Sequence, residues 1–197
     1  DGSFSTHTLV NGWMLMHLPD KISDVTASAF PCPTLTAYQA FNKISGSIAG
    51  QHVLVNGAGG SVGFMLTQLL LRANAKVYIT SSPTHHPDFY SRGVLHAYNY
   101  NDPLWKAKLV EHLGANTLYA AFDTVSPSSA AQLAPLLGYY GHLVPIQGQV
   151  NSELLGDAPL SCISIHQVAL GAIHRFASEK QLKQLMLSGE KLLSEIA

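Results

Sequence analysis

Short apolar runs alternate along most of this chain with stretches in which hydrophobic residues recur at helical spacing. The run at 53–55 is followed by such a stretch, made of Val62, Met65, Leu66, Leu69, Leu70 and Ala73. Further runs that we interpret as strands lie at 76–80, 96–98, 118–122, 142–146 and 162–165. Strands that alternate with helices in this way predict βαβ units and a parallel sheet. We therefore predict an α/β fold, a Rossmann-type doubly wound sheet of six parallel strands.

The residues before this region show a different pattern. Residues 2–18 alternate apolar and polar positions, which predicts a strand. Ser23 is typical of a helix N-cap, so a helix is expected to begin there. Pro31 and Pro33 should interrupt this helix before it resumes and continues to Phe41.

Helix boundaries are also marked in the second half of the chain. The Asp-Pro pair at 102–103 and the Ser-Pro pair at 126–127 are typical helix starts. Gly114 and Gly138 are expected to end these two helices. Residues 178–181 have the pattern of a capping box, which predicts a last amphipathic helix.

Four glycines lie within seven residues between the run at 53–55 and its helix: Gly57, Gly59, Gly60 and Gly63. A strand that turns tightly into a helix leaves backbone N–H groups unpaired, and these attract phosphate. The pattern predicts a dinucleotide-binding turn. The strict G-x-G-x-x-G spacing is missed by one place, because Val62 stands where the third glycine should be. An ordinary strand–turn–helix with glycines for packing is the alternative.

The residues after the second strand bear on the choice of cofactor. A carboxylate here would bind the ribose hydroxyls of NAD, but residues 80–82 are Thr-Ser-Ser and the nearest acid is Asp88. Small hydroxyl residues leave room for a 2′-phosphate, which His85, His86 or Arg92 could face. The sequence therefore favours NADP over NAD. The alternative for the two histidines is a pair of solvated loop residues.

Composition narrows the remaining classes. The 197 residues are 47% hydrophobic and only 12% charged, with a net charge of −1, which gives no basic field for nucleic acid or an anionic membrane. Two cysteines give neither a disulfide framework nor a C-x-x-C pair, and no apolar run is long enough to span a membrane. We expect a cytoplasmic protein. Its weakly charged surface and the tyrosine pair at 139–140 lead us to expect a homodimer.

The order of these motifs resembles the medium-chain dehydrogenase/reductase superfamily, close to its quinone oxidoreductase and zinc-type alcohol dehydrogenase branches. The similar segments are 2–4, 35–40, 53–63, Gly93 with 99–100, 122–125 and 143–148. The resemblance implies a pyrophosphate at 59–62, a 2′-phosphate beside 81–82 and His85, and an adenosine near Tyr100. The nicotinamide would lie between Thr36, Val125 and residues 147–148.

The predicted cofactor-binding set is therefore Gly57, Ala58, Gly59, Gly60, Ser61, Val62, Thr80, Ser81, Ser82, His85, Tyr100, Val125, Gln147 and Gly148. Thr36 is the candidate catalytic residue, since its hydroxyl could pass a proton. Cys32 aligns with a position that supplies one ligand of a catalytic zinc in the zinc-type branch. Such a zinc needs three protein ligands, so we assign no metal site to this chain and leave zinc in a longer protein open.

The resemblance implies an NADP(H)-dependent oxidoreductase that transfers hydride to or from a carbonyl, enone, quinone or alcohol. Residues 1–22 would be a remnant of a catalytic domain and residues 23–197 the NAD(P)-binding domain. With most of that catalytic domain missing, we expect the chain alone to be inactive on its small-molecule substrate. The alternative is a nucleotide-binding sensor or interaction module without catalysis.

Overall fold

The computed structural model describes residues 5–156 and 162–196, so the family-like segment at 2–4 lies outside the described residues. The chain divides into two compact units. One unit comprises residues 36–169 and contains the sheet. The other is built from the residues before Thr36 and those after Ala169.

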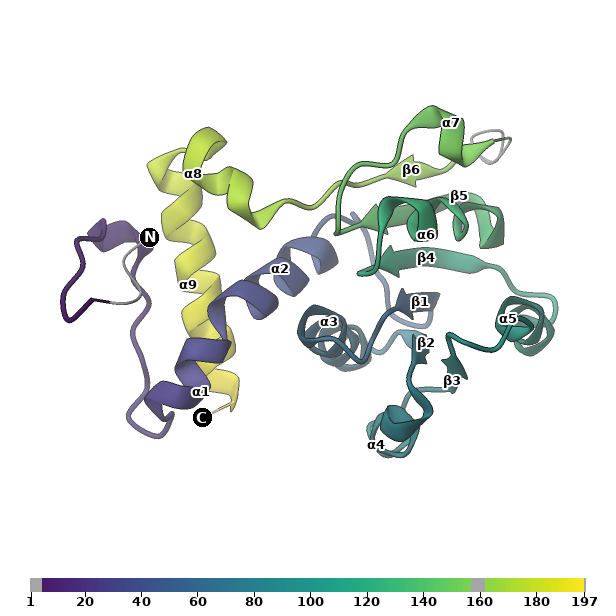
Figure 1. The fold of residues 1–197 in the computed structure, drawn as a ribbon, viewed down its shortest axis with the longest axis horizontal. Coiled ribbons are helices and arrows are strands. Elements are labelled where there is room, and N and C mark those ends of the chain that lie inside the picture. The colour runs from purple at the N-terminus through teal and green to yellow at the C-terminus, as the bar shows by residue number, and fades with distance from the viewer. Residues whose placement is uncertain (1–4, 157–161, 197) are drawn as a thin grey trace. The chain divides into compact units, whose positions relative to one another are not determined.

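The larger unit contains a six-stranded sheet in which every pair of neighbouring strands is parallel (Figure 1). In spatial order the strands are β3 (His96–Asn99), β2 (Lys76–Ser81), β1 (His52–Asn56), β4 (Leu118–Asp123), β5 (Leu137–Pro145) and β6 (Ser164–Ile165). The order 3-2-1-4-5-6 is that of the doubly wound dinucleotide fold. The predicted fold class is confirmed.

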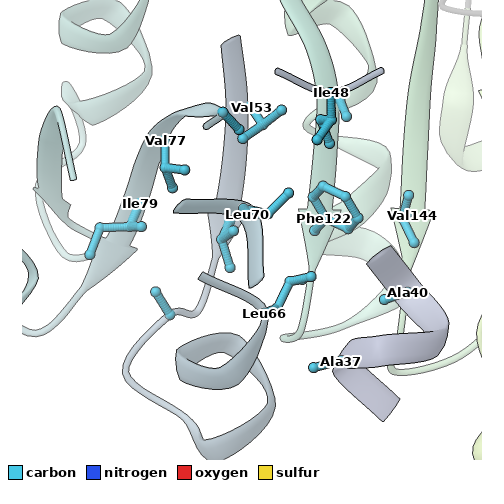
Figure 2. Close-up of a cluster of buried hydrophobic side chains, with 14 of the residues drawn as sticks. Ala37, Ala40, Ile48, Val53, Leu66, Leu70, Val77, Ile79, Phe122 and Val144 are labelled. Atoms are coloured by element: carbon cyan, nitrogen blue, oxygen red, sulfur yellow. The ribbon is translucent and has the colours of Figure 1, made fainter. Parts of the chain in front are cut away.

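One face of the sheet is covered by helix α3 (Ser61–Arg72), helix α4 (His86–Ser91) and the part of α2 (Pro31–Phe41) that belongs to this unit. Every second residue of the central strands points to this side, as the strand period of two requires. Figure 2 shows the resulting core, which includes Val53, Val77, Phe122 and Val144 from the strands and Leu66 and Leu70 from α3.

The opposite face is covered by helix α5 (Trp105–Leu113), helix α6 (Pro127–Ala131) and helix α7 (Ser152–Leu155). Its core joins the alternate strand residues to these helices. Leu54, Tyr78, Ala121 and Leu143 come from the sheet, and Leu109, Leu113 and Ala131 come from the helices. Burial on both faces explains why the central strands are continuous apolar runs.

The smaller unit has a core of its own around Ile22, Phe30 and Leu193. Its helices are α1 (Asp24–Ala29), α8 (Ile173–Phe176), α9 (Glu179–Ile196) and the beginning of α2, with 3₁₀ turns at Gly12–Met14 and Leu170–Ala172. The predicted capping box is confirmed: Gln181 N–H donates to Ser178 Oγ, and Ser178 N–H donates to Gln181 Oε1. None of the helices in the described residues is long and apolar enough to cross a membrane.

One prediction for the N-terminal region is wrong. The described residues from 5 to 18 form no strand, and a 3₁₀ turn at Gly12–Met14 is their regular element. The predicted interruption of the next helix is present, because α1 ends at Ala29 and α2 begins at Pro31. Pro31 and Pro33 belong to the resumed helix and lie in its first turn, where the backbone N–H that proline lacks would have no helical partner.

The boundary between α6 and β5 also differs from the prediction. The helix that begins at Pro127 ends at Ala131, and Leu137 and Gly138 belong to β5 instead of ending a helix. Strand β5 is bulged here, since Leu118 pairs with Leu137 while Ala120 pairs with His142. A Cβ on Gly138 would lie 2.2 Å from Thr117 Oγ1, so only glycine fits.

Helix starts shift slightly elsewhere. Asp102 accepts a hydrogen bond from Leu104 N–H and caps a turn, and α5 itself begins at Trp105. Helix α4 begins at His86.

Candidate cofactor-binding site

The glycine turn between β1 and α3 is shaped by two positions that tolerate no side chain. Gly57 has φ +83°, and a Cβ there would lie 2.4 Å from Thr124 Oγ1. A Cβ on Gly63 would lie 2.4 Å from the Gly57 carbonyl oxygen and 2.8 Å from Ala58 Cα. These two glycines let the strand turn sharply and let the first turn of α3 pack against it.

Gly60 is different, because the space beside it is open. It is the N-cap of α3 with an extended backbone, and a Cβ there would meet only the Gly57 carbonyl oxygen, at 3.7 Å. Gly59, Gly60 and Ser61 are exposed. The first N–H groups of a helix have no partner within it and carry the positive end of its dipole. The end of α3 therefore offers an open site for an anion.

A buried polar network fixes the strand ends beneath this turn. Asn56, the last residue of β1, donates from Nδ2 to Asp123 Oδ2 at 2.7 Å and to Ser129 Oγ at 2.7 Å. Its Oδ1 accepts from Thr80 Oγ1, which in turn accepts the N–H of Gly57 at 3.0 Å. The network joins the ends of β1, β2 and β4 to the start of α6.

Asp123 is the anionic member of this network and is only 1% exposed. Besides Asn56, it accepts from Ser129 Oγ at 2.7 Å and from the N–H groups of Val125 and Ser126, each at 2.9 Å. These bonds set the path of the chain after β4. Sequence reasoning did not select Asn56, Asp123 or Ser129 as site residues. The sequence signal that could have identified them is that a polar residue ends each of two buried apolar strands, Asn56 in β1 and Asp123 in β4.

A cavity of about 700 Å³ opens at the carboxyl ends of the strands. Its walls are the ends of β1 and β2, the β3–α5 connection and the β4–α6 region. The lining includes Gly57, Thr80, Tyr100, Val125, Trp105, Lys106 and Gln132. The structure thus brings four residues of the predicted set together, and adds Trp105, Lys106 and Gln132, which the sequence reasoning missed.

Two lysines determine the charge of the β3–α5 wall of this cavity. Lys106 Nζ donates to Gln132 Oε1 at 2.8 Å and lies 5.6 Å from the centre of the Trp105 ring. The carboxylate of Asp102 also lines the cavity, but it pairs with Lys108 at 2.6 Å. The hydrogen bond from Lys108 lowers the pKa of this carboxyl. The β3–α5 wall therefore presents an aromatic ring and a cation, and its carboxylate is neutralised.

The tip of β2 meets the glycine turn. The ring of His85 lies against Gly59, where a Cβ would be 3.1 Å from His85 Cδ2 and 3.6 Å from Ser81 Cβ. Ser81 is buried, and Ser82 Oγ is 3.0 Å from Thr84 Oγ1. Gly59, Ser81 and His85 thus form a second group of predicted residues next to the turn.

Other predicted residues have different surroundings. Ala58 is fully buried and its N–H donates to the Thr80 carbonyl at 2.9 Å, so Ala58 and Thr80 build the turn from within. Gln147 is exposed after β5, and Gly148, with φ +131°, lies against Pro127 at the start of α6. Thr36 is a buried residue of α2.

The described residues do not offer a zinc site. Among them, no group of three histidine, cysteine or acidic side chains is placed to hold a metal ion. Cys32 is exposed in the first turn of α2. Because a catalytic zinc takes three protein ligands, the residues around Cys32 do not fit this metal.

The chain is similar in sequence to known reductases and dehydrogenases, although no family model matches it. It is 31% identical over 174 residues to a trans-enoyl reductase of Aspergillus flavipes, covering 80% of this chain and 44% of that protein. It is 33% identical over 142 residues to a zinc-type alcohol dehydrogenase-like protein of Schizosaccharomyces pombe, covering 68% of this chain and 41% of that protein. The chain thus spans less than half the length of these relatives. Further relatives include highly reducing polyketide synthases of fungi.

Solved structures share the fold. An alcohol dehydrogenase superfamily protein from Novosphingobium aromaticivorans superimposes with a TM-score of 0.79 and 20% identity, covering 95% of this chain and 56% of that one. The homologues and structural neighbours of this chain are members of the medium-chain dehydrogenase/reductase family. The resemblance inferred from the motifs is confirmed, and the homologues are oxidoreductases.

Proposed function

We propose that this chain binds NADP(H) along the carboxyl edge of its sheet and serves as the cofactor-binding part of an oxidoreductase. The observation that carries the proposal is the continuity of the site. The open N-terminus of α3, the glycine turn and the 700 Å³ cavity all meet at Gly57. In open parallel sheets this edge is where dinucleotides bind.

Each part of a dinucleotide has a matching group here. The pyrophosphate would be held by backbone N–H groups at the start of α3, where the helix dipole favours negative charge. The adenosine would occupy the cavity, against Tyr100 and Trp105 on one wall. The nicotinamide would lie toward Val125, Gln147, Gly148 and Thr36. Ala58 and Thr80 would keep the turn rigid from within.

NADP is preferred over NAD in this proposal because of the β2 tip. Residues 80–82 carry hydroxyl groups, and the nearest acid in the chain, Asp88, pairs with Arg92 at 2.9 Å. The carboxylate that would bind a free ribose 2′-hydroxyl is therefore absent from 80–82, and a 2′-phosphate would meet no negative charge there.

The bound cofactor would supply a hydride, and the protein would position it and exclude water. Among the substrates considered, we favour a carbon–carbon double bond conjugated to a carbonyl, since one relative is a trans-enoyl reductase. Such a reduction adds the hydride to the β-carbon and a proton to the α-carbon, and it leaves NADP⁺. The Thr36 hydroxyl is our candidate for passing that proton.

The glycine turn provides a matched test of cofactor binding. Gly60→Val places a branched side chain in the open space at the start of α3, where the protein itself has room for it. We expect the variant to fold and to bind NADP⁺ about a hundredfold more weakly, as measured by calorimetry. Gly63→Ala is the contrasting variant, because its Cβ would collide with the Gly57 carbonyl. It should lose about 2 kcal/mol of stability.

Retained affinity in a folded Gly60→Val variant would remove the anion site from the α3 N-terminus. Equal stability of Gly63→Ala and the unaltered chain would contradict the close packing described for the turn.

A further inference from the structure

Three cationic or titratable side chains follow the β2 tip, and the structure separates them. The His86 ring contacts two other groups: its Nε2 lies 3.4 Å from the Ser81 carbonyl oxygen, and the ring is edge-on to Tyr90. Arg92 donates from Nε to Asp88 Oδ2 at 2.9 Å, and its guanidinium lies 5.0 Å from the centre of the Phe64 ring. The contacts of both side chains are thus with residues outside the glycine turn at 57–61.

His85 is the side chain that reaches the turn. It lies in the 3₁₀ turn Pro83–His85, it is exposed, and its ring packs against the backbone of Gly59. A Cβ on Gly59 would be 3.5 Å from His85 Nε2 and 3.6 Å from Ser81 Cβ. A phosphate group placed between the turn and the β2 tip would therefore meet the imidazole of His85.

We propose that His85 reads the 2′-phosphate of NADP and that its proton makes the preference for NADP over NAD depend on pH. This inference rests on the proposed function. An imidazole changes its charge between about pH 5 and 8. The imidazolium donates a charge-assisted hydrogen bond to phosphate, whereas the neutral ring brings no positive charge. Selectivity for NADP should therefore fall as the pH rises.

The charged and titratable groups that face His85 come from α4 and from its neighbour in the chain. Asp88 on α4 faces it and interacts with it electrostatically, but Asp88 is paired with Arg92 on the same helix. His86 is its chain neighbour. The β2 tip contributes the uncharged hydroxyls of Ser81, Ser82 and Thr84, and the glycine turn at 57–61 carries no charged side chain. His85 is thus the titratable group that lies against the turn.

The pH range of the test follows from the ligand. A phosphate monoester takes up its second proton near about pH 6, so between about pH 6.5 and 8.5 the 2′-phosphate stays largely doubly charged. Adenosine 2′,5′-bisphosphate and 5′-AMP differ by that phosphate, and NADP⁺ and NAD⁺ differ in the same way. The ratio of their dissociation constants isolates the contact made by the 2′-phosphate.

Calorimetric titrations with both ligand pairs at about pH 6.5 and about pH 8.5 test the proposal. In the unaltered chain the preference for the phosphorylated ligand should fall about tenfold from the lower to the higher pH. His85→Gln should show a small preference that does not change with pH. His85→Lys should show a large preference that does not change either. His86→Gln is the matched control and should keep the pH dependence of the unaltered chain.

The same pH dependence in His85→Gln as in the unaltered chain would overturn the proposal, as would a constant preference in the unaltered chain. A pH dependence that is lost in His86→Gln and kept in His85→Gln would assign the role to His86 and overturn the proposal. If both NAD⁺ and NADP⁺ bind without a pH effect, the role of His85 fails and the proposed function stands. If neither dinucleotide binds in any of the variants, both fail together.

Discussion

At the scale of single residues, Asp123 is the group on which the order of the site depends. It accepts hydrogen bonds from Asn56 Nδ2, Ser129 Oγ and two backbone N–H groups while it is almost completely buried. An amide in place of the carboxylate keeps one accepting oxygen, so the two donors bound to the other oxygen would lose their acceptor or face an N–H group.

We therefore expect Asp123→Asn to lose about 3 kcal/mol of unfolding free energy in urea denaturation. Cofactor affinity should fall as well, because the network holds the turn through Asn56 and Thr80. Ser128→Ala is a suitable control, since Ser128 is an exposed residue on the rim of the same cavity. A change below about 0.5 kcal/mol in Asp123→Asn would show that the network does not stabilise the fold.

The residue scale also shows what the sequence could reveal about the site. The glycine spacing predicted the turn because a positive φ and a close backbone approach are requirements of the local chain, as Gly57 and Gly63 show. The bond between Asn56 and Asp123 joins residues 67 positions apart, so local pattern gave no sign of it. The cavity residues Trp105 and Lys106 were missed for the same reason, since the fold alone brings them opposite Val125.

At the scale of elements, two pairs of imidazoles join parts of the larger unit. His96 of β3 stacks on His112 of α5 with ring centres 3.8 Å apart. His142 of β5 lies 2.9 Å, Nδ1 to Nε2, from His166, which follows β6. Burial is the main cause that lowers the pKa of His96, His142 and His166 from the ordinary value of 6.5.

The stability of the fold should therefore fall on mild acidification. A histidine whose pKa is lower in the folded chain binds its proton more weakly there, so the unfolded chain takes up more protons as the pH drops below 6.5. Stability is present above that pH and is lost as the pH falls through the folded pKa values. The pKa values of Asp88 and Asp102 are also lowered in the folded chain, so protonation of these carboxyls reduces stability only below their ordinary pKa of 3.8.

Urea unfolding at about pH 7.5 and 5.0 tests this expectation, with a lower midpoint at the acidic pH. His166→Gln should show a smaller difference between the two midpoints, because one partner of the pair is then uncharged at both pH values. An equal or higher midpoint at the acidic pH in the unaltered chain would contradict the account.

Elements with strong local signals were predicted well, and elements set by distant contacts were not. Helices α3 and α9 have clear periodicity and identifiable starts at Gly60 and Ser178. Leu133, Leu136 and Leu137 fit a helix by spacing, yet Leu137 begins β5. Leu137 pairs with Leu118 of the adjacent strand, and Gly138 lies against Thr117; no local pattern contains these contacts.

At the scale of the whole molecule, we propose self-association through the bulge of β5. Tyr139 and Tyr140 are 72% and 62% exposed, with ring centres 4.2 Å apart, on a chain with only 12% charged residues. Paired exposed aromatic rings favour protein contacts. Sedimentation at tens of micromolar, a concentration on the order of weak interface affinities, should show a dimer.

The double variant Tyr139→Ser with Tyr140→Asn should be monomeric in the same experiment. Asparagine suits the second position because Tyr140 has φ +58°, a backbone conformation that asparagine tolerates. A monomeric unaltered chain, or a double variant that still dimerises, would show that this surface is not the interface.

The central claim is that the carboxyl edge of the sheet binds NADP(H) in preference to NAD(H). The most direct test is calorimetric titration of the unaltered chain with NADP⁺ and with NAD⁺ near pH 6.5. The account predicts one site, with NADP⁺ bound at least about tenfold more tightly, because the 2′-phosphate meets His85 and no carboxylate at residues 80–82. Equal affinities, tighter binding of NAD⁺, or no binding of either dinucleotide would contradict it.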